Sequence, residues 1–115
     1  ELCSKLTKND IILCPAYIVG APHETCEDVE YGLDRLLGLR DIHNIFMDLP
    51  YIAFITPFPG TQLCEEYERQ GLIIDKDWSH YDAEHVVVRS QCPPEKLVEL
   101  RDNFYARFDK GKQEI

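Results

Sequence analysis

Two short stretches of the sequence combine residue types that could hold a ligand. The first is Gly20-Ala21-Pro22-His23-Glu24-Thr25, and the second is Thr56-Pro57-Phe58-Pro59-Gly60-Thr61. Gly20 permits close approach of the backbone to a ligand, and the free amides of a helix that begins after Thr25 suit an anion or a carboxylate. The simpler alternative is two ordinary turns, in which Glu24 only compensates the dipole of the following helix.

The cysteines and histidines show no spacing typical of a metal site. They are Cys3, Cys14, Cys26, Cys64 and Cys92, and His23, His43, His80 and His85. The five cysteines are odd in number and scattered without a C-x-x-C pair. We therefore expect no disulfide framework, a reducing cytoplasmic setting, and no metal site built within this chain. Cys64 and Cys92 are interpreted as buried or incidental thiols, and the four histidines as surface or packing residues.

Each stretch follows a run of residues that predicts a buried strand. Ala16 to Gly20 is apolar, with Ile11 to Cys14 as its lead-in before Pro15. Tyr51 to Thr56 is the second run, and the prolines that follow it cannot continue a sheet ladder. The strands are expected to be parallel, because a helix long enough for a crossover lies between them. Their carboxyl ends, and with them the two stretches, should then share one rim, where α/β proteins bind ligands.

The helices are predicted from capping residues and apolar spacing. Thr25 with Asp28 resembles a capping box, and the helix that follows should stop near Gly38. Its apolar stripe consists of Cys26, Val29, Leu33, Leu36 and Leu37. Thr61 should cap a second helix over 62–70, which ends at Gly71. The segment 39–50 shows no clear pattern and is assigned as a connection.

The last third of the chain is predicted to be mostly helical. Trp78 and Tyr81 are expected to anchor an irregular segment, and 86–88 is a candidate short strand. Pro93-Pro94 should open a final helix. The apolar face of that helix would comprise Leu97, Leu100, Phe104 and Phe108.

Composition excludes several classes of partner. The apolar share of 44% is enough for a packed core, and the net charge of −9 argues against nucleic acid or an anionic membrane. The apolar runs are too short to span a membrane, and the polar segment 1–10 is not a signal peptide. Two strands and one crossover helix cannot bury both faces of a sheet. The chain should therefore pair with another copy or be part of something larger, and we favour the second.

The two stretches, together with the strands before them, resemble a known family. Tyr17 to Thr25, followed after a helix by Ile55 to Thr61, is similar to the C-terminal half of radical S-adenosylmethionine (SAM) enzymes, above all the cobalamin-binding subgroup with the anaerobic magnesium-protoporphyrin monomethyl ester cyclases. Glu65-Glu66-Tyr67, Gly71-Leu72-Ile73 and Trp78-Ser79-His80-Tyr81-Asp82 continue the resemblance in the same order. It extends over most of the chain, from Ile12 to Phe108.

The resemblance implies a fold, cofactors and site residues. The fold would be α/β, a fragment of a partial (β/α)6 TIM-like barrel: residues 1–61 hold the last βαβ part and 62–115 a mostly helical extension. Ile18, Gly20 and Glu24 would seat SAM, and Thr56, Phe58 and Thr61 would line the substrate side. The parent would use SAM, a [4Fe–4S] cluster and, in this subgroup, cobalamin, and would act on a small molecule as a cyclase, methyltransferase or oxidoreductase.

Two departures limit this interpretation. His23 replaces the glycine usual in the family, and the Cys-x-x-x-Cys-x-x-Cys motif that ligates the cluster is absent. The chain alone should therefore be inert, self-associate through exposed apolar faces, and depend on a missing N-terminal part of its polypeptide. One alternative is an unrelated α/β enzyme that binds a phosphate ligand. The sequence does not support it, because no glycine-rich phosphate-binding loop is present. The other is a non-catalytic, acidic α/β protein-interaction module.

Overall fold

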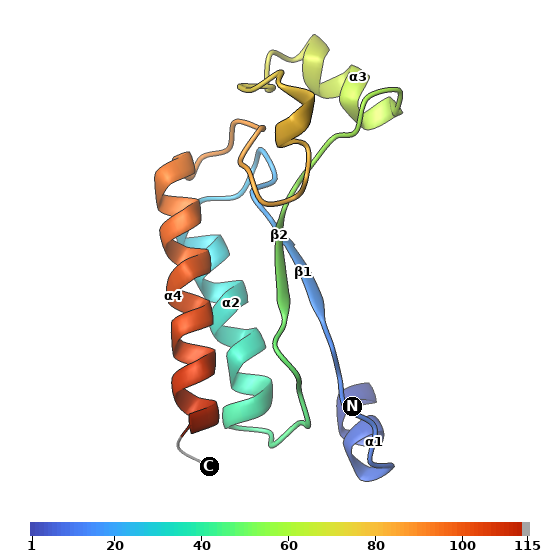
Figure 1. The fold of residues 1–115 in the computed structure, drawn as a ribbon, viewed down its shortest axis with the longest axis vertical. Helices are drawn as coiled ribbons and strands as arrows, with labels where there is room; N and C mark the ends of the chain where they lie inside the picture. The colour runs from blue at the N-terminus through green and yellow to red at the C-terminus, as the bar shows by residue number, and fades with distance from the viewer. Residues whose placement is uncertain (114–115) are drawn as a thin grey trace.

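The structure is a computed structural model that describes residues 1–113, with side chains up to residue 110 (Figure 1). Two strands, four α-helices and a short 3-10 helix are found in this range. In chain order they are α1 (Leu2–Lys8), β1 (Ala16–Val19), α2 (Cys26–Asp41), β2 (Tyr51–Phe54), α3 (Gln62–Arg69), η1 (Trp78–His80) and α4 (Pro94–Gln113). The predicted α/β architecture is therefore present, with helix α1 as an addition.

The sheet contains β1 and β2, which pair in parallel as predicted. Ala16 lies opposite Tyr51 and Val19 opposite Phe54. An isolated parallel bridge between Leu13 and Met47 extends the pairing in the amino-terminal direction. The predicted lead-in to the first strand thus runs beside the second strand's own lead-in, and Pro15 separates it from β1.

Helices α2 and α4 lie side by side on one face of the sheet (Figure 1). The core between the two layers is formed by apolar residues of all four elements, and it includes the four apolar residues predicted for the last helix. Its buried members are Val19, Val29, Leu33, Leu36, Leu37, Ile52, Phe54, Cys92, Leu97, Leu100, Phe104 and Phe108. The opposite face of the sheet, called the bare face below, has no helix over it: Ile18 and Tyr51 point away from the helices and are exposed, although Ala53, opposite Ile18, is buried.

Helix α2 starts as predicted and ends later than predicted. Thr25 and Asp28 form both hydrogen bonds of a capping box. The expected stop at Gly38 is wrong, because the helix continues to Asp41. The extra turn brings Arg40 to α4, where its Nη1 donates to the carbonyl oxygen of Phe108 at 2.6 Å and its guanidinium lies 4.0 Å from the ring centroid of the same residue. This tertiary contact offsets the modest cost of a glycine within a helix.

The downstream elements agree with the sequence in part. Thr61 caps α3, and Gly71 follows its end with φ +68°. Pro94 begins α4. The strand predicted over 86–88 is wrong: only one antiparallel bridge, between Ile73 and Val88, forms there. Both valines at 87 and 88 are nevertheless buried, so their apolar character serves packing rather than a strand.

The prediction that Cys92 is a buried or incidental thiol is correct in its burial but wrong in its thiol state. Cys92 is buried and forms a disulfide with Cys26, the first residue of α2, with a Cα–Cα distance of 4.7 Å. Cys3, Cys14 and Cys64 remain free. The sequence showed Cys26 only as part of an apolar stripe, because a bridge between residues 66 positions apart leaves no local pattern.

The two outer edges of the sheet differ. On β2, the amide of Ile52 donates to the hydroxyl oxygen of Tyr105 at 2.9 Å, and the amide of Phe54 donates to the carbonyl oxygen of Ala83 at 2.8 Å. On β1, the backbone groups of Ala16 and Ile18 face the other edge and find no such partner within residues 1–113. Another strand could therefore join the sheet beside β1 but not beside β2.

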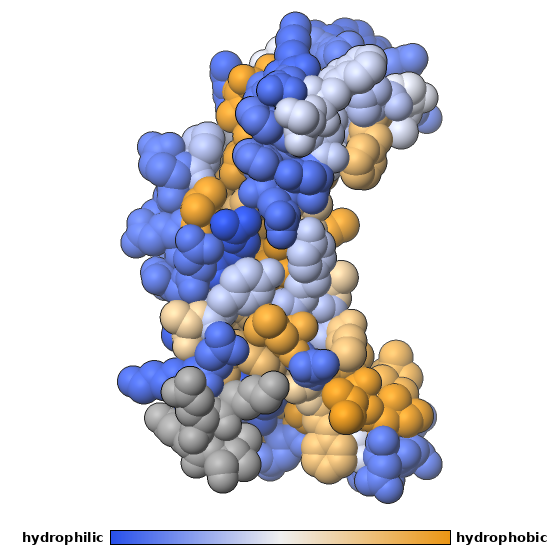
Figure 2. All heavy atoms as spheres, viewed as in Figure 1, coloured by the Kyte–Doolittle hydropathy of each residue, from blue (hydrophilic) through white to orange (hydrophobic). Residues whose placement is uncertain are grey.

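Apolar side chains also gather at the amino-terminal end of the strands, where α1 meets the α2–β2 connection (Figure 2). The exposed members of this patch are Leu2, Ile11, Ile12, Ile42, Phe46 and Leu49. Helix α1 was not predicted, because a seven-residue helix has little intrinsic signal. Over residues 1–113, none of the helices combines the length and the apolar content needed to cross a membrane.

Candidate functional site

The first predicted stretch is a turn closed by one carboxylate. Glu24 Oε1 accepts hydrogen bonds from the amides of Gly20 at 2.9 Å and Ala21 at 2.8 Å. Gly20 has φ +93°, a conformation that side chains disfavour, and the side chain of Leu97 from α4 packs over it. The structure therefore brings Gly20 and Glu24 together as expected and shows what Glu24 does: it holds the turn in place.

The beginning of α2 lies directly after this turn. Thr25 Oγ1 accepts from the amide of Asp28, and Asp28 Oδ2 accepts from the amide of Thr25, each at 3.1 Å. The hydrogen bonds from the Thr25 amide and hydroxyl keep the pKa of Asp28 below its usual value. The capping box therefore already occupies two of the amides that could otherwise bind an anion. His23, where the family has glycine, is exposed and leaves the Glu24 hydrogen bonds intact.

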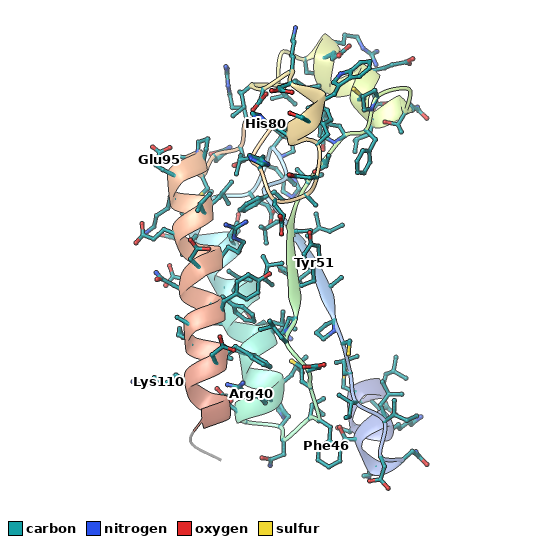
Figure 3. The ribbon with its side chains drawn as sticks, viewed as in Figure 1. Arg40, Phe46, Tyr51, His80, Glu95 and Lys110 are labelled. Atoms are coloured by element: carbon teal, nitrogen blue, oxygen red, sulfur yellow. A yellow bond between two sulfur atoms is a disulfide. The ribbon has the colours of Figure 1, made fainter. Side chains whose placement is uncertain are left out.

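Ile18 lies one residue before the end of β1, on the bare face of the sheet. Its side chain is 64% exposed, although its neighbour Val19 is 1% exposed. Tyr51 of β2 lies on the same face and is exposed as well (Figure 3). An exposed branched apolar side chain next to a glycine turn is a suitable surface for a flat, apolar ring.

The second stretch is a rigid elbow after β2. Thr56 Oγ1 donates to the carbonyl oxygen of Phe54 at 3.0 Å. Thr61 Oγ1 donates to the carbonyl oxygen of Phe58 at 2.6 Å and accepts from the amide of Cys64 at 3.2 Å. Both threonine side chains thus hold backbone groups in place, whereas the Phe58 ring is exposed and free to contact a ligand.

The two stretches leave the sheet at the same edge. The amide of Ile55 donates to the carbonyl oxygen of Val19 at 2.9 Å, so the pairing continues to the last residue before each turn. The expectation that a parallel pair places both strand ends on one rim is therefore confirmed. Beyond the rim the chains diverge: the first turn leads into α2 and the second elbow leads away to α3 (Figure 1).

Several hollows with volumes of about 280–510 Å³ lie on the surface of the molecule. The hollow beside the second elbow has a volume of about 330 Å³. Its lining residues are Pro59, Gly60, Cys64, Glu65, Glu68, Lys76, Trp78 and Tyr81. Burial raises the pKa of the Cys64 thiol, and nearby Glu68 and Glu65 add to the effect. Sequence reasoning did not connect α3 with 76–81, because only the fold brings them together.

The two aromatic residues of this hollow behave differently. Tyr81 anchors the segment as predicted, since its hydroxyl donates to the carbonyl oxygen of Asp75 at 3.0 Å. Burial raises the pKa of its phenol. The prediction that Trp78 is a packing anchor is wrong, because its side chain is 73% exposed. A tryptophan presented to solvent at the rim is available for contact with a ligand or a partner.

A histidine–aspartate cluster surrounds His80, which lies at the end of the molecule that carries α3 (Figure 3). His80 Nδ1 lies 2.7 Å from Asp75 Oδ2, and His85 Nδ1 lies 2.9 Å from Asp82. The two imidazole rings stack at 4.4 Å between centroids. The hydrogen bond to Asp75 raises the pKa of His80, and hydrogen bonds from the Asp77 amide and His80 lower that of Asp75.

This cluster explains two of the histidines that were predicted as surface or packing residues. His80 and His85 are in fact partners of carboxylates that brace the irregular segment 75–85, whereas His23 and His43 are simply exposed. Among residues 1–113 no group of three or more ligating side chains is arranged to hold a metal ion. The aspartates at 75, 77 and 82 also accept backbone amides, so these carboxylates shape the loop.

Comparison with known proteins gives one partial similarity. No protein-family model matches the chain. Over 67 residues the chain is 42% identical to the bacteriochlorophyllide d C-8(2)-methyltransferase of Chlorobaculum tepidum. The matched part is 58% of this chain but 14% of the relative. The chain is therefore similar to a short portion of a methyltransferase that is several times longer than the match.

Proposed function

We propose that this chain is the C-terminal part of a radical SAM enzyme, and that it contributes part of the rim that binds SAM and substrate. The observation that carries the proposal is the arrangement of the three residues that the resemblance assigns to SAM. Gly20 and Glu24 form one turn, and the exposed side chain of Ile18 lies on the sheet face two residues before Gly20. The similarity to the Chlorobaculum tepidum methyltransferase supports the same class of parent.

The sheet supports the proposal that the chain is the end of a barrel. A last strand has a neighbour on one side only, and the outer edge of β2 is closed by Tyr105 and Ala83. Among the described residues, no backbone group pairs with the outer edge of β1, so a preceding strand could bind there. Helices α2 and α4 cover one face, as the outer layer of a βα barrel does, and the bare face with Ile18 would line the inside.

The residues present fit parts of the SAM molecule. Ile18 offers an exposed apolar surface for the adenine, and Gly20 lets the backbone approach the ligand. Glu24 is a positioning residue in this scheme, because its Oε1 is engaged with the amides of the turn. SAM and a reduced [4Fe–4S] cluster would supply radical chemistry, and the thiolates for that cluster would come from outside residues 1–115.

The second strand end would shape the substrate side. Thr56 and Thr61 hold the elbow, and Phe58 and Trp78 are exposed beside it. The relative is named as a methyltransferase that acts on bacteriochlorophyllide d. Among the cyclase, methyltransferase and oxidoreductase reactions that the resemblance includes, we therefore place methyl transfer first, with cobalamin as its accompanying cofactor.

The direct test is to determine the coding sequence upstream of Glu1. We expect a Cys-x-x-x-Cys-x-x-Cys motif within about 100–200 residues, a typical domain span. An initiator codon immediately before Glu1 would overturn the proposal and favour the interaction-module alternative. If the motif is present, the full protein is reconstituted anaerobically and assayed for SAM cleavage. Ile18→Asp should abolish cleavage, whereas Ile42→Asp, which alters an exposed isoleucine at the far end of α2, should preserve it.

The isolated chain provides a second test. Its bare sheet face and the apolar patch around α1 should make it self-associate, so its sedimentation should depend on concentration. A chain that stays monomeric over a wide concentration range would count against a missing barrel partner. A single defined oligomer, combined with the absence of the cluster motif upstream, would support the interaction module.

A further inference from the structure

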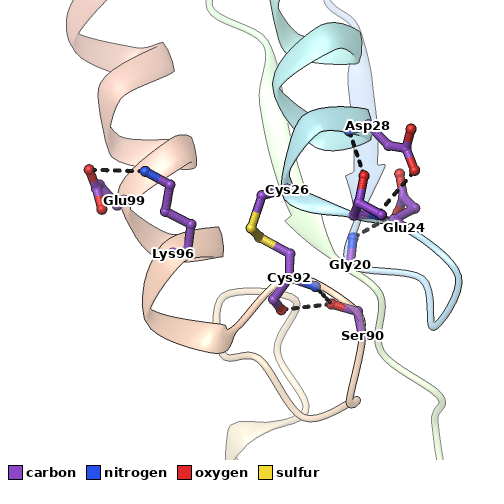
Figure 4. The surroundings of a disulfide bond; sticks show 9 residues. Gly20, Glu24, Cys26, Asp28, Ser90, Cys92, Lys96 and Glu99 are labelled. Carbon is purple, nitrogen blue, oxygen red and sulfur yellow. Dashed lines mark hydrogen bonds and ion pairs between the residues drawn. A yellow bond between two sulfur atoms is a disulfide. The ribbon is translucent and has the colours of Figure 1, made fainter.

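We infer that Cys26 and Cys92 form a reversible thiol–disulfide pair whose oxidation state controls how firmly the Gly20–Glu24 turn is held. The inference rests on the geometry of this chain alone and does not depend on the proposed parent enzyme. It concerns a covalent link that joins two parts of the site's support, the start of α2 and the segment that leads into α4 (Figure 4).

The link lies next to the turn on both sides. Cys26 is two residues after Glu24, whose carboxylate closes the turn. Cys92 immediately precedes Pro93, and Leu97 in the first turns of α4 packs over Gly20 at 3.5 Å from the position that a Cβ would take. The disulfide therefore fastens α4 at the point where α4 presses on the turn.

Cys92 is fixed from its other side as well. Ser90 Oγ donates to the carbonyl oxygen of Cys92 at 2.8 Å and accepts from its amide at 3.2 Å (Figure 4). The two prolines that follow restrict the backbone between Cys92 and α4. Once the disulfide is opened, the segment 90–93 keeps this local structure, but α4 is joined to the turn only by noncovalent packing.

The two cysteines differ in exposure, and this difference favours attack at Cys26. Cys92 is 1% exposed, whereas Cys26 is half-buried. An incoming thiolate can therefore attack the sulfur of Cys26, break the bond to Cys92 and release the Cys92 thiolate, which takes up a proton. A second thiolate then displaces Cys26, so that two external thiols become one external disulfide and the protein gains two thiols. The reverse reaction, with oxidised glutathione as the small-molecule disulfide, restores the link and yields two reduced glutathiones.

The test uses the full chain, equilibrated in glutathione buffers of graded ratio. Free thiols are trapped by alkylation and located by peptide mass spectrometry. Cys26 and Cys92 should be protected together without bound glutathione and should become alkylated together as the buffer is made more reducing, whereas Cys14, which is exposed and free, should carry a mixed disulfide with glutathione in the oxidising buffers. Alkylation of Cys26 or Cys92 under fully oxidising conditions would overturn the pairing.

The coupling to the turn is measured by amide hydrogen exchange. On reduction the amides of Gly20 and Ala21 should exchange at least about tenfold faster. The amide of Leu13, which donates to Phe46 at the other end of the sheet, should change little. Cys92→Ser should show the fast exchange under all conditions, and Cys14→Ser should keep the redox-dependent difference. Equal exchange in oxidised and reduced wild-type protein would overturn the inference even if a cysteine variant failed to fold.

Discussion

Glu24 can be tested for its role in holding the first strand end. Its carboxylate accepts two amides, at 2.9 and 2.8 Å, and hydrogen bonds to a charged group contribute about 1.5–3 kcal/mol each. Because the side chain is only half-buried, we discount this sum and expect Glu24→Ala to lower the free energy of unfolding by about 2–3 kcal/mol. Glu24→Gln keeps a neutral acceptor and should cost about 1 kcal/mol.

The assay is urea unfolding at low protein concentration, followed by circular dichroism. With an m-value of about 2 kcal/mol/M, Glu24→Ala should shift the midpoint by about 1–1.5 M. Glu27→Ala is the matched control, since it removes the same charge from the first turn of α2 and should cost about 0.3–1 kcal/mol through the helix dipole alone. Equal shifts for the two alanine variants would refute the bracing role, because charge near the helix start would then explain both.

Three further predictions concern the stability of the whole chain. Reduction of Cys26–Cys92, which are 66 residues apart, should lower the free energy of unfolding by up to about 4 kcal/mol, as measured by urea unfolding with and without a thiol reductant. Gly38→Ala should raise it by about 0.5–1 kcal/mol, because Gly38 lies within α2 and an added Cβ would meet only Ile42 at an ordinary 3.6 Å; a loss of stability would show that this turn is strained. The raised pKa of His80 should stabilise the fold below about pH 6.5, with loss as the pH rises through its folded-state pKa, and the lowered pKa of Asp75 should stabilise it above about pH 3.8, with loss as the pH falls. Thermal unfolding from pH 3 to 8 should therefore show this dependence, and His80→Asn should flatten its upper limb.

The parts of the fold that the sequence predicted are those encoded over a few neighbouring residues. Thr25 with Asp28, Thr61, and the proline pair at the start of α4 each specify a helix start within about one turn of chain. Helix spacing likewise identified the core residues of α2 and α4, and the apolar runs identified those of the strands, although Ile18 and Tyr51 of these runs are exposed. The late end of α2 was missed because the contact between Arg40 and Phe108, which favours the extra turn, joins segments far apart in the chain.

The parts that the sequence could not predict depend on tertiary proximity. The disulfide, the stacked pair His80 and His85, and the bond from Ile52 to Tyr105 each require the fold before the partners meet. For the candidate site, the sequence identified the residues of the first strand end but not which of them hold the turn and which remain free to contact a ligand. Glu24 was predicted to help seat SAM, and only the structure shows that its carboxylate is engaged by the backbone.

The two strand ends are supported to different degrees, and this difference bears on the proposed function. The Gly20 turn is held by the Glu24 carboxylate, by Leu97 and by the neighbouring disulfide. A seat for a cofactor used in every turnover benefits from such preorganisation, because no binding free energy is then spent on ordering the turn. The second elbow is held by threonine hydroxyls but presents Phe58 and Trp78 to solvent. Under the proposal, the rigid end receives SAM, and the end with exposed aromatic side chains adapts to the substrate.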